Sequence, residues 1–218
     1  MKVGTDGVLL GAWADGGQHI LDIGTGTGLV ALMMAQRFPK AKVVAVDIDD
    51  NAYCQASANV ANSPFKSQVE TYHDSIQNFT EHWSALNPFD SIVCNPPYFE
   101  KSLKNLDAKT SLARHNDELS WNDLATCVDQ LLSHDGIFSV IVPIDGYEKL
   151  TEKLYIKCFK EYRSCKLLTK ENKPCKRILA SFTKDLSRTS YTERQILMTQ
   201  DGKRSQWYES LTKNFYIY

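Results

Sequence analysis

The chain has 218 residues, of which 43% are apolar and 23% are charged, and its formal net charge is −1. This length suits one large core, so we expect a single domain spanning residues 1–218. No window offers the roughly 18 apolar residues that a membrane span needs, and residues 1–17 do not resemble a signal peptide. We therefore expect a cytoplasmic protein without membrane association, and nothing in the sequence points to an obligate protein partner.

The near-neutral total hides an uneven distribution of charge. Residues 1–150 contain 10 Lys and Arg against 19 Asp and Glu, whereas residues 151–218 contain 15 against 7. A basic C-terminal third is typical of a surface that meets nucleic acid, although a solvated lysine-rich surface has the same composition. The six cysteines show no CxxC pair and no Cys/His spacing suited to a metal, so we predict neither a metal site nor a redox role.

Short apolar runs alternate with amphipathic helical patterns over the first 160 residues. In chain order, the predicted strand and helix pairs are 19–24 and 29–38, 42–48 and 51–62, 68–73 and 75–83, 89–94 and 121–134, and 136–144 and 147–159. This alternation is the signature of right-handed βαβ units on a parallel sheet that is covered on both faces.

The pattern changes after residue 160. Two further predicted strands, 161–170 and 177–184, are joined by a polar turn rather than by a crossover helix, which indicates an antiparallel edge. The apolar run 194–199 and the aromatic tail 207–218 follow, and the pattern does not place them. We predict an α/β fold, doubly wound and Rossmann-like, with a mostly parallel seven-stranded sheet and an antiparallel edge strand.

A glycine-rich loop, LDIGTGTG at 21–28, joins the first strand to the helix that follows it. Gly24, Gly26 and Gly28 lie where the backbone must pass close to a ligand. The dinucleotide-binding fingerprint would have its third glycine one residue later, where this chain has Leu29. A plain glycine turn is the structural alternative.

Acidic residues lie at the ends of three successive predicted strands. Asp22 precedes the glycines, Asp47 ends the second strand just before Ile48, and Asp74 ends the third strand just before Ser75. A carboxylate at the second strand end suits ribose hydroxyls, because it accepts two hydrogen bonds at once. Asp74 would accept a hydrogen bond from an adenine amino group, and a helix cap at Asp74 or Ser75 is the alternative. Together they suit a ligand with an adenosine and a positive centre, such as S-adenosylmethionine.

The tetrapeptide NPPY at 95–98 follows the fourth predicted strand, beside the crevice where open α/β sheets bind ligands. An exocyclic adenine amine is planar and a poor nucleophile, so a site must hold both of its hydrogens on acceptors. The side-chain carbonyl of Asn95 and the backbone carbonyl of Pro96 would be those acceptors. Pro96 and Pro97 would fix the direction of that carbonyl, and Tyr98 would offer a face on which the base stacks. A purely structural proline turn is the alternative.

With these motifs the sequence resembles the class I S-adenosylmethionine-dependent methyltransferases of the NPPY type, and more narrowly the bacterial tRNA1(Val) adenine methyltransferase family. That family modifies the exocyclic amine of the adenine next to the anticodon. The segments that carry the resemblance are MKVGTDGVLLGAW (1–13), LDIGTGTGLVALMMAQR (21–37), AVDID (45–49), NPPY (95–98) and RILASF (177–182). Members of the family usually carry an N-terminal stretch before the KVGTDG motif, so we expect the chain to lack a short extension.

The resemblance implies that Thr5 and Asp6 cover the methionine end of the donor, whereas the residues alone would make them a turn before a helix. It further implies that the rest of the donor site and the acceptor site lie on the motifs already described. The cofactor-binding candidates are Thr5, Asp6, Asp22, Gly24, Gly26, Gly28, Asp47, Ile48, Asp74 and Ser75. The catalytic candidates are Asn95, Pro96, Pro97 and Tyr98.

The expected partner is a valine tRNA, recognised at its anticodon loop, with S-adenosylmethionine as the cofactor. The basic segment 166–177 would hold the phosphates, together with Lys101, Lys104, Lys109, Arg114 and His115. Three other readings stay open. They are a protein methyltransferase acting on the amide nitrogen (N5) of glutamine, a DNA adenine methyltransferase, and a non-catalytic RNA-binding Rossmann domain.

Overall fold

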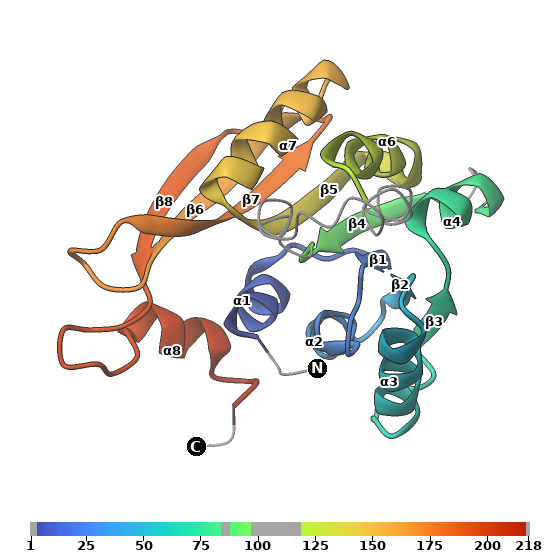
Figure 1. Ribbon diagram of the computed structural model, residues 1–218, viewed down its shortest axis with the longest axis horizontal. Helices are drawn as coiled ribbons and strands as arrows, with labels where there is room; N and C mark the ends of the chain where they lie inside the picture. The colour runs from blue at the N-terminus through green and yellow to red at the C-terminus, as the bar shows by residue number, and fades with distance from the viewer. Residues whose placement is uncertain (1–3, 84–87, 97–118, 217–218) are drawn as a thin grey trace, which may run out of the picture.

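The computed structural model of the chain describes residues 4–83, 88–96 and 119–216 (Figure 1). The strands are β1 (His19–Ile23), β2 (Lys42–Asp47), β3 (Val69–His73), β4 (Phe89–Cys94), β5 (Leu132–Pro143), β6 (Lys160–Leu168), β7 (Cys175–Thr183) and β8 (Tyr191–Ile196). The helices are α1 (Thr5–Trp13), α2 (Leu29–Arg37), α3 (Asp50–Ala61), α4 (Ile76–His82), α6 (Trp121–Leu131), α7 (Ile144–Ile156) and α8 (Gln206–Thr212).

The strands form one sheet in the order β3-β2-β1-β4-β5-β7-β6-β8. The first five of these strands are parallel to one another, whereas β7 runs antiparallel to both β5 and β6. The chain order reverses between β1 and β4, which is the kind of switch point where doubly wound sheets bind ligands. The predicted doubly wound α/β fold is therefore confirmed.

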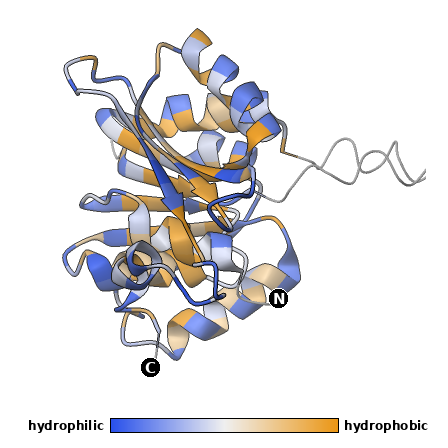
Figure 2. Ribbon diagram, turned by 90° about the vertical axis from the view of Figure 1, so that its left-hand side faces the viewer, coloured by the Kyte–Doolittle hydropathy of each residue, from blue (hydrophilic) through white to orange (hydrophobic). Residues whose placement is uncertain are grey.

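The sheet has eight strands among the described residues rather than the seven predicted, and the antiparallel strand lies inside it. β7 is buried on both faces from Ile178 to Thr183, so it fits between β5 and β6. β8 pairs in parallel with β6 and forms the edge, where Thr192 and Arg194 are exposed and Glu193 is half-buried. Figure 2 shows β8 as a largely hydrophilic strand at the front of the sheet.

Helices cover both faces of the sheet. In Figure 1, α4, α6 and α7 lie on one face, and α1, α2, α3 and α8 lie on the other. Alternate residues of each strand supply the two cores: in β1, Leu21 and Ile23 pack towards α4 and α6, whereas Ile20 packs towards α1 and α2. Asp22 alternates with Leu21 and Ile23, so its side chain lies on the face of α2.

Helix α1 is buried from Gly7 to Trp13, and arginine side chains hold its C-terminal end. Arg37 donates through Nη1 to the carbonyls of Gly11 and Ala14, at 2.8 and 2.7 Å, and Arg163 donates to the carbonyl of Trp13. Cations are favourable there because the last carbonyls of a helix carry partial negative charge. The C-terminal end of α1 is thereby tied to α2 and to β6.

The candidate residues lie at one end of the sheet, where the parallel strands finish. The carboxyl ends of β1, β2, β3 and β4 meet there, and these ends lead into the glycine loop, Asp47, Asp74 and Asn95. The register pairs Pro143 at the end of β5 with Arg177 near the start of β7, so the turn between β6 and β7 lies at the same end. None of the helices in the described ranges is both long and apolar enough to cross a membrane.

The end of α7 provides a test of local backbone energetics. The N–H of Cys158 bonds to the carbonyl of Tyr155 at 3.0 Å, and the N–H of Phe159 bonds to that of Leu154 at 3.1 Å, which is the Schellman pattern. Cys158 has φ 63°, in the left-handed region that this pattern usually assigns to glycine, and its side chain is exposed.

We expect Cys158→Gly to raise the free energy of unfolding by about 1 kcal/mol, because a side chain in the left-handed region is strained. Urea denaturation measures the change. Cys158→Ala is the control, since it removes the thiol but keeps Cβ, and it should bring no gain. Equal stability of the wild type and the glycine variant would contradict the prediction.

Candidate functional site

The glycine loop turns sharply between β1 and α2. Gly24, Gly26 and Gly28 all have positive φ, at 68°, 60° and 78°. A Cβ built on Gly28 would lie 3.4 Å from Cα of Ala56, which is ordinary contact, so the positive φ rather than crowding by α3 favours glycine at this position. A Cβ built on Gly24 would meet no described atom within 4 Å, and Gly24 is exposed. The loop therefore presents bare backbone to open space at Gly24.

The side chain of Asp22 holds this loop in place through hydrogen bonds. Its Oδ2 accepts hydrogen bonds from Oγ1 of Thr25 at 2.6 Å and from the backbone N–H of Ala31 at 3.0 Å, and the side chain is 1% exposed. Burial raises the pKa of Asp22 to about 7, although the two hydrogen bonds lower it and the nearby charge of Asp47 raises it further. These contacts support a role in shaping the loop, and direct contact with the donor stays a prediction.

The raised pKa of Asp22 has a consequence for stability. Between pH 4 and pH 7 the folded chain holds a proton on Asp22 that the unfolded chain has lost, so the free energy of unfolding falls as the pH rises. We expect Asp22→Asn to remove this part of the pH dependence, at most about 4 kcal/mol in the free energy of unfolding, because asparagine does not titrate. The variant should still fold, since the amide oxygen can accept both hydrogen bonds. Urea denaturation of both proteins from pH 5 to pH 8 measures it, and parallel pH profiles would contradict it.

Asp47 ends β2 next to the glycine loop. Its Oδ2 accepts from the N–H of Gly26 at 2.7 Å, and its Oδ1 accepts from the N–H of Asp49 at 3.0 Å. Each carboxylate oxygen can accept a second hydrogen bond, so the group is held in place and still available to hydroxyls of a ligand. The next side chain, Ile48, is 53% exposed and offers an apolar surface beside it.

Asp74 and Ser75 join β3 to α4. The N–H of Asp74 bonds to the carbonyl of Asp47 at 3.1 Å, which brings these two strand ends together. Ser75 is the N-cap of α4, because its Oγ accepts from the N–H of Asn78 at 3.1 Å. Oδ1 of Asp74 accepts from the N–H of Ser75 at 2.8 Å. The capping alternative holds for Ser75, and contact of Asp74 with an adenine stays a prediction.

Thr5 and Asp6 form the first turn of α1, so the alternative that they form a turn before a helix is wrong. Thr5 is exposed. Oδ2 of Asp6 lies 3.1 Å from Nε of Arg177, and both side chains are about a quarter exposed. This ion pair joins the KVGTDG motif to the RILASF motif across 171 positions of sequence.

Asn95 follows the buried end of β4 and is half-buried, and Pro96 is buried. A Cβ built on Gly7 would lie 3.3 Å from Cδ2 of Leu29 and 3.9 Å from Nδ2 of Asn95, so α1 passes close to Asn95 where it has no side chain. The amide of Asn95 makes no hydrogen bond with any residue in the described ranges.

The structure thus brings most of the candidates to one end of the sheet. Gly7 emerges as a residue without an expected role, whereas Arg177, the last residue of the basic segment expected to hold phosphates, is paired with Asp6 instead. Pro97 and Tyr98 lie outside the described residues. So do the basic candidates Lys101, Lys104, Lys109, Arg114 and His115.

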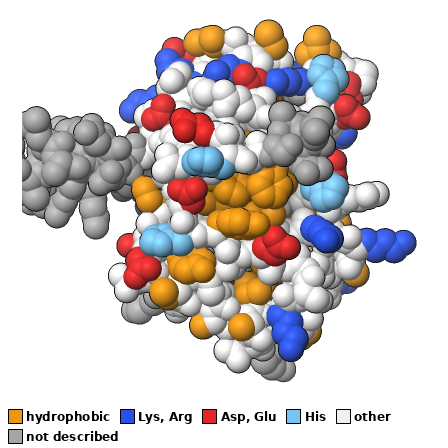
Figure 3. All heavy atoms as spheres, turned by 90° about the vertical axis from the view of Figure 1, so that its right-hand side faces the viewer, with side chains coloured by type: hydrophobic (Ala, Val, Ile, Leu, Met, Phe, Trp, Pro, Cys, Tyr) orange, Lys and Arg blue, Asp and Glu red, His pale blue; other side chains and the backbone are white. Residues whose placement is uncertain are grey.

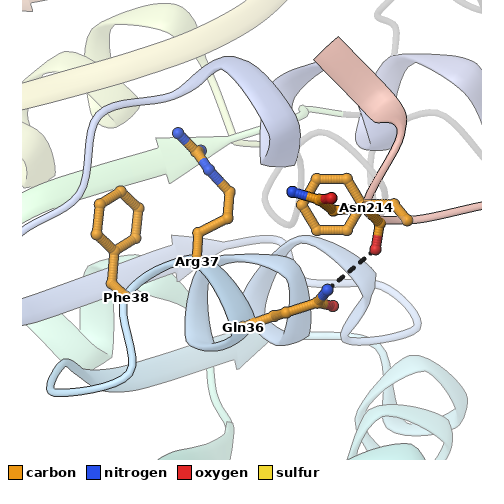
Figure 4. Close-up of a pocket in the computed structure, with 5 residues that line it drawn as sticks. Gln36, Arg37, Phe38 and Asn214 are labelled. Carbon is orange, nitrogen blue, oxygen red and sulfur yellow. Dashed lines mark hydrogen bonds between the residues drawn. The ribbon is translucent and has the colours of Figure 1, made fainter. Parts of the chain in front are cut away.

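A pocket of about 350 Å³ lies elsewhere, between the end of α2 and the C-terminal segment (Figure 4). Gln36, Arg37, Phe38, Asn214 and Phe215 line it, and Nε2 of Gln36 donates to the carbonyl of Asn214 at 3.0 Å. Helix α2 starts at the glycine loop, near the carboxyl ends of the strands, and ends at this pocket. The pocket therefore lies towards the other end of the strands from the candidate residues. We assign it no part in the site.

Comparison with known protein families shows which family carries the glycine loop and the segment around Asn95. The family model described as "Methyltransferase small domain" matches residues 4–120, more than half of the chain. The chain belongs to this methyltransferase family. The match contains the α1 motif, the glycine loop, Asp47 and Asn95, so the residues that meet at the crevice are those of a methyltransferase.

Curated relatives match over the whole of this methyltransferase. A Bacteroides fragilis protein is 41% identical over 100% of the chain and 91% of its own length, and a Vibrio parahaemolyticus protein is 39% identical over 100% and 89%. Both are named tRNA1(Val) (adenine(37)-N6)-methyltransferase.

Solved structures share the fold. The Agrobacterium tumefaciens protein Atu636, a predicted O-methyltransferase, is 16% identical and superposes with a TM-score of 0.73 over 98% of both chains. TrmN from Thermus thermophilus is 19% identical, with a TM-score of 0.57 over 81% of this chain and 46% of that one. At these identities the likeness shows a methyltransferase fold and no more.

The methyl donor of this enzyme is S-adenosylmethionine, as the family implies. The site fits it on two observations. The open space at Gly24 leaves room for a ligand against the backbone, and Asp47 has acceptor capacity left for ribose hydroxyls. The side chain of Ile48, next to Asp47, is exposed, and its contact with the donor stays a prediction.

Proposed function

We propose that this methyltransferase transfers the methyl group of S-adenosylmethionine to N6 of adenine 37 in tRNA1(Val). The observation that carries the proposal is the relationship to proteins of that name, at 36–42% identity over the whole chain. The amide of Asn95, which lies beside α1 and has no hydrogen-bond partner among the described residues, supports it, because a planar amine needs such an acceptor. As tRNA is its substrate, the enzyme would act in the cytoplasm.

The chain's own residues would hold the two reactants and orient the amine. Asp47 and the backbone at Gly24 would hold the donor, with Thr5 and Asp6 near its methionine end and Asp74 near its adenine. The side-chain carbonyl of Asn95 and the backbone carbonyl of Pro96 would each accept one hydrogen of the N6 amine, which aims the nitrogen lone pair. Pro97 and Tyr98 complete this proposed acceptor site.

Bound S-adenosylmethionine supplies an electrophilic methyl carbon: the N6 lone pair forms the new C–N bond as the C–S bond breaks, and the nitrogen then loses one proton to water. No strong general base is required, because the amine becomes acidic as it is methylated. Orientation of the two reactants would lower the barrier by several kcal/mol, up to roughly 7–11 kcal/mol.

The test is methylation in vitro with a radiolabelled donor methyl group. The protein is incubated with a tRNA1(Val) transcript, with the same transcript carrying guanine at position 37, and with a protein that contains accessible glutamines. We expect label in N6-methyladenosine from the first RNA alone. Label only in the protein would support the glutamine reading, and donor binding without transfer to any substrate would support the non-catalytic reading.

A further inference from the structure

The turn between β6 and β7 lies at the same end of the strands as the proposed acceptor site. Leu168 at the end of β6 pairs with Cys175 at the start of β7, so residues 169–174 form the turn, and Pro143 of β5 pairs with Arg177. β7 is two strands from β4 in the sheet. Cys94 at the end of β4 pairs with Val140, three residues before Pro143, so with about 4.8 Å between strands and about 3.3 Å per residue Arg177 lies roughly 14 Å from Cys94. RNA bound at Asn95 would pass within reach of this turn.

This turn and its flanks are basic, and part of that charge is uncommitted. The segment 169–176 contains three lysines, Lys170, Lys173 and Lys176, against the single acidic residue Glu171. Lys173 and Lys176 are exposed, and the ammonium group of neither makes a hydrogen bond or an ion pair with the residues that the structure describes. By contrast Lys203, in the neighbouring turn, is paired with Asp201 at 3.4 Å.

The turn is also held in place. Nζ of Lys170 donates to the carbonyl of Gln200 at 3.1 Å, which ties it to the next turn of the chain. Arg177, directly after Lys176, is paired with Asp6 in α1. Because α1 also passes Asn95 at Gly7, the turn, α1 and the acceptor site form one connected frame. A charge on this turn therefore keeps a defined place relative to Asn95.

The outer strand β3, at the side of the sheet away from β6, β7 and β8, does not suit RNA. Figure 3 shows the side of β3, where hydrophobic side chains gather among acidic and histidine side chains. Tyr72 is 37% exposed there, and Asp49, Asp50 and Glu70 are also exposed. Carboxylates repel phosphates, so electrostatics favour the turn between β6 and β7.

We propose that the β6–β7 turn holds the tRNA backbone next to adenine 37, with Lys173 and Lys176 as phosphate contacts. The proposal rests on the proposed function, because it requires an RNA substrate. Contacts between these lysines and phosphates do not read the base sequence of the RNA. They position the anticodon loop so that the base reaches Asn95. An acidic protein segment is the competing occupant, and the experiment separates the two.

The experiment compares the double variant Lys173→Ala/Lys176→Ala with Lys40→Ala/Lys42→Ala. The second pair is the matched control, because Lys40 and Lys42 are exposed lysines at the start of β2, whereas the candidate site lies where the strands finish. Fluorescence anisotropy measures the affinity for a labelled tRNA1(Val) transcript between 50 and 300 mM salt, and calorimetry measures the affinity for S-adenosylmethionine. The kcat/KM for tRNA is measured in parallel.

We expect the turn variant to bind tRNA roughly tenfold more weakly at about 0.15 M salt, with a salt dependence shallower by about 1.4 in log–log slope, as for two lost contacts to single-stranded RNA. The control and the donor affinity should stay at wild-type values. Equal losses in both variants, or none in the turn variant, would overturn the proposal. So would weaker binding of an acidic peptide with tRNA binding unchanged. Failure of the wild type to methylate tRNA that it binds would count against the proposed function and leave the binding result intact.

Discussion

Asn95→Ala is expected to lower kcat/KM for methyl transfer by at least about a hundredfold, while the affinity for S-adenosylmethionine stays at its wild-type value. The amide of Asn95 would hold one hydrogen of the amine in the transition state, and removing one such contact typically costs 10²- to 10³-fold. The donor-site candidates Gly24 and Asp47 lie at the ends of other strands, so their contacts should survive. Single-turnover transfer to tRNA1(Val) and calorimetry with the donor measure the two effects.

The companion variant Asn95→Asp keeps the size of the side chain and an acceptor oxygen, so it should retain more activity than the alanine variant. An exposed asparagine at a helix C-cap, Asn62, provides a control for the substitution itself, and Asn62→Ala should leave transfer unchanged. A donor affinity that falls with the activity of Asn95→Ala would show that Asn95 belongs to the donor site. Unchanged transfer would remove it from the reaction altogether.

Gly24→Ala should weaken the binding of S-adenosylmethionine by on the order of tenfold or more, with only about 1–2 kcal/mol lost from the free energy of unfolding. The loss of stability reflects the positive φ of 68° at Gly24. The protein leaves the space of the new methyl group empty, so the steric conflict arises only with the bound donor. Calorimetry with the donor and urea denaturation separate the two losses.

Gly202 offers a matched control, because it is exposed, has φ 83° and has no atom within 4 Å of a built Cβ. It lies in the turn after β8, away from the glycine loop. Gly202→Ala should therefore cost a similar amount of stability and leave donor affinity unchanged. If both alanine variants bound the donor equally well, the donor would not approach the backbone at Gly24.

Much of the fold follows from local pattern. The strand runs 19–24, 42–48 and 89–94 were predicted within one residue of β1, β2 and β4, because parallel strands buried on both faces need continuous apolar segments. The glycine loop was also predictable, because three positive φ angles in five residues require glycine. β8 was not predicted in its place, since an edge strand buries little and Tyr191–Ile196 is largely polar.

The candidate residues of the site came from separate segments. Asp47, Asp74 and Asn95 were named because they lie at or just after strand ends, which a parallel sheet brings together; their contacts with the donor and the base stay predictions. The sequence could not indicate that Asp22 points at α2 and takes up two hydrogen bonds of the loop, since that depends on how α2 packs.

The sequence by itself determined the alternation of strands and helices and the chemistry at the strand ends, because these follow from burial periodicity and backbone conformation within short segments. Only the tertiary structure decided that β7 lies between β5 and β6. That order brings Arg177 to Asp6 and the β6–β7 turn towards Asn95. Contacts between residues 171 positions apart depend on the order in which strands pair, and no short segment contains that information.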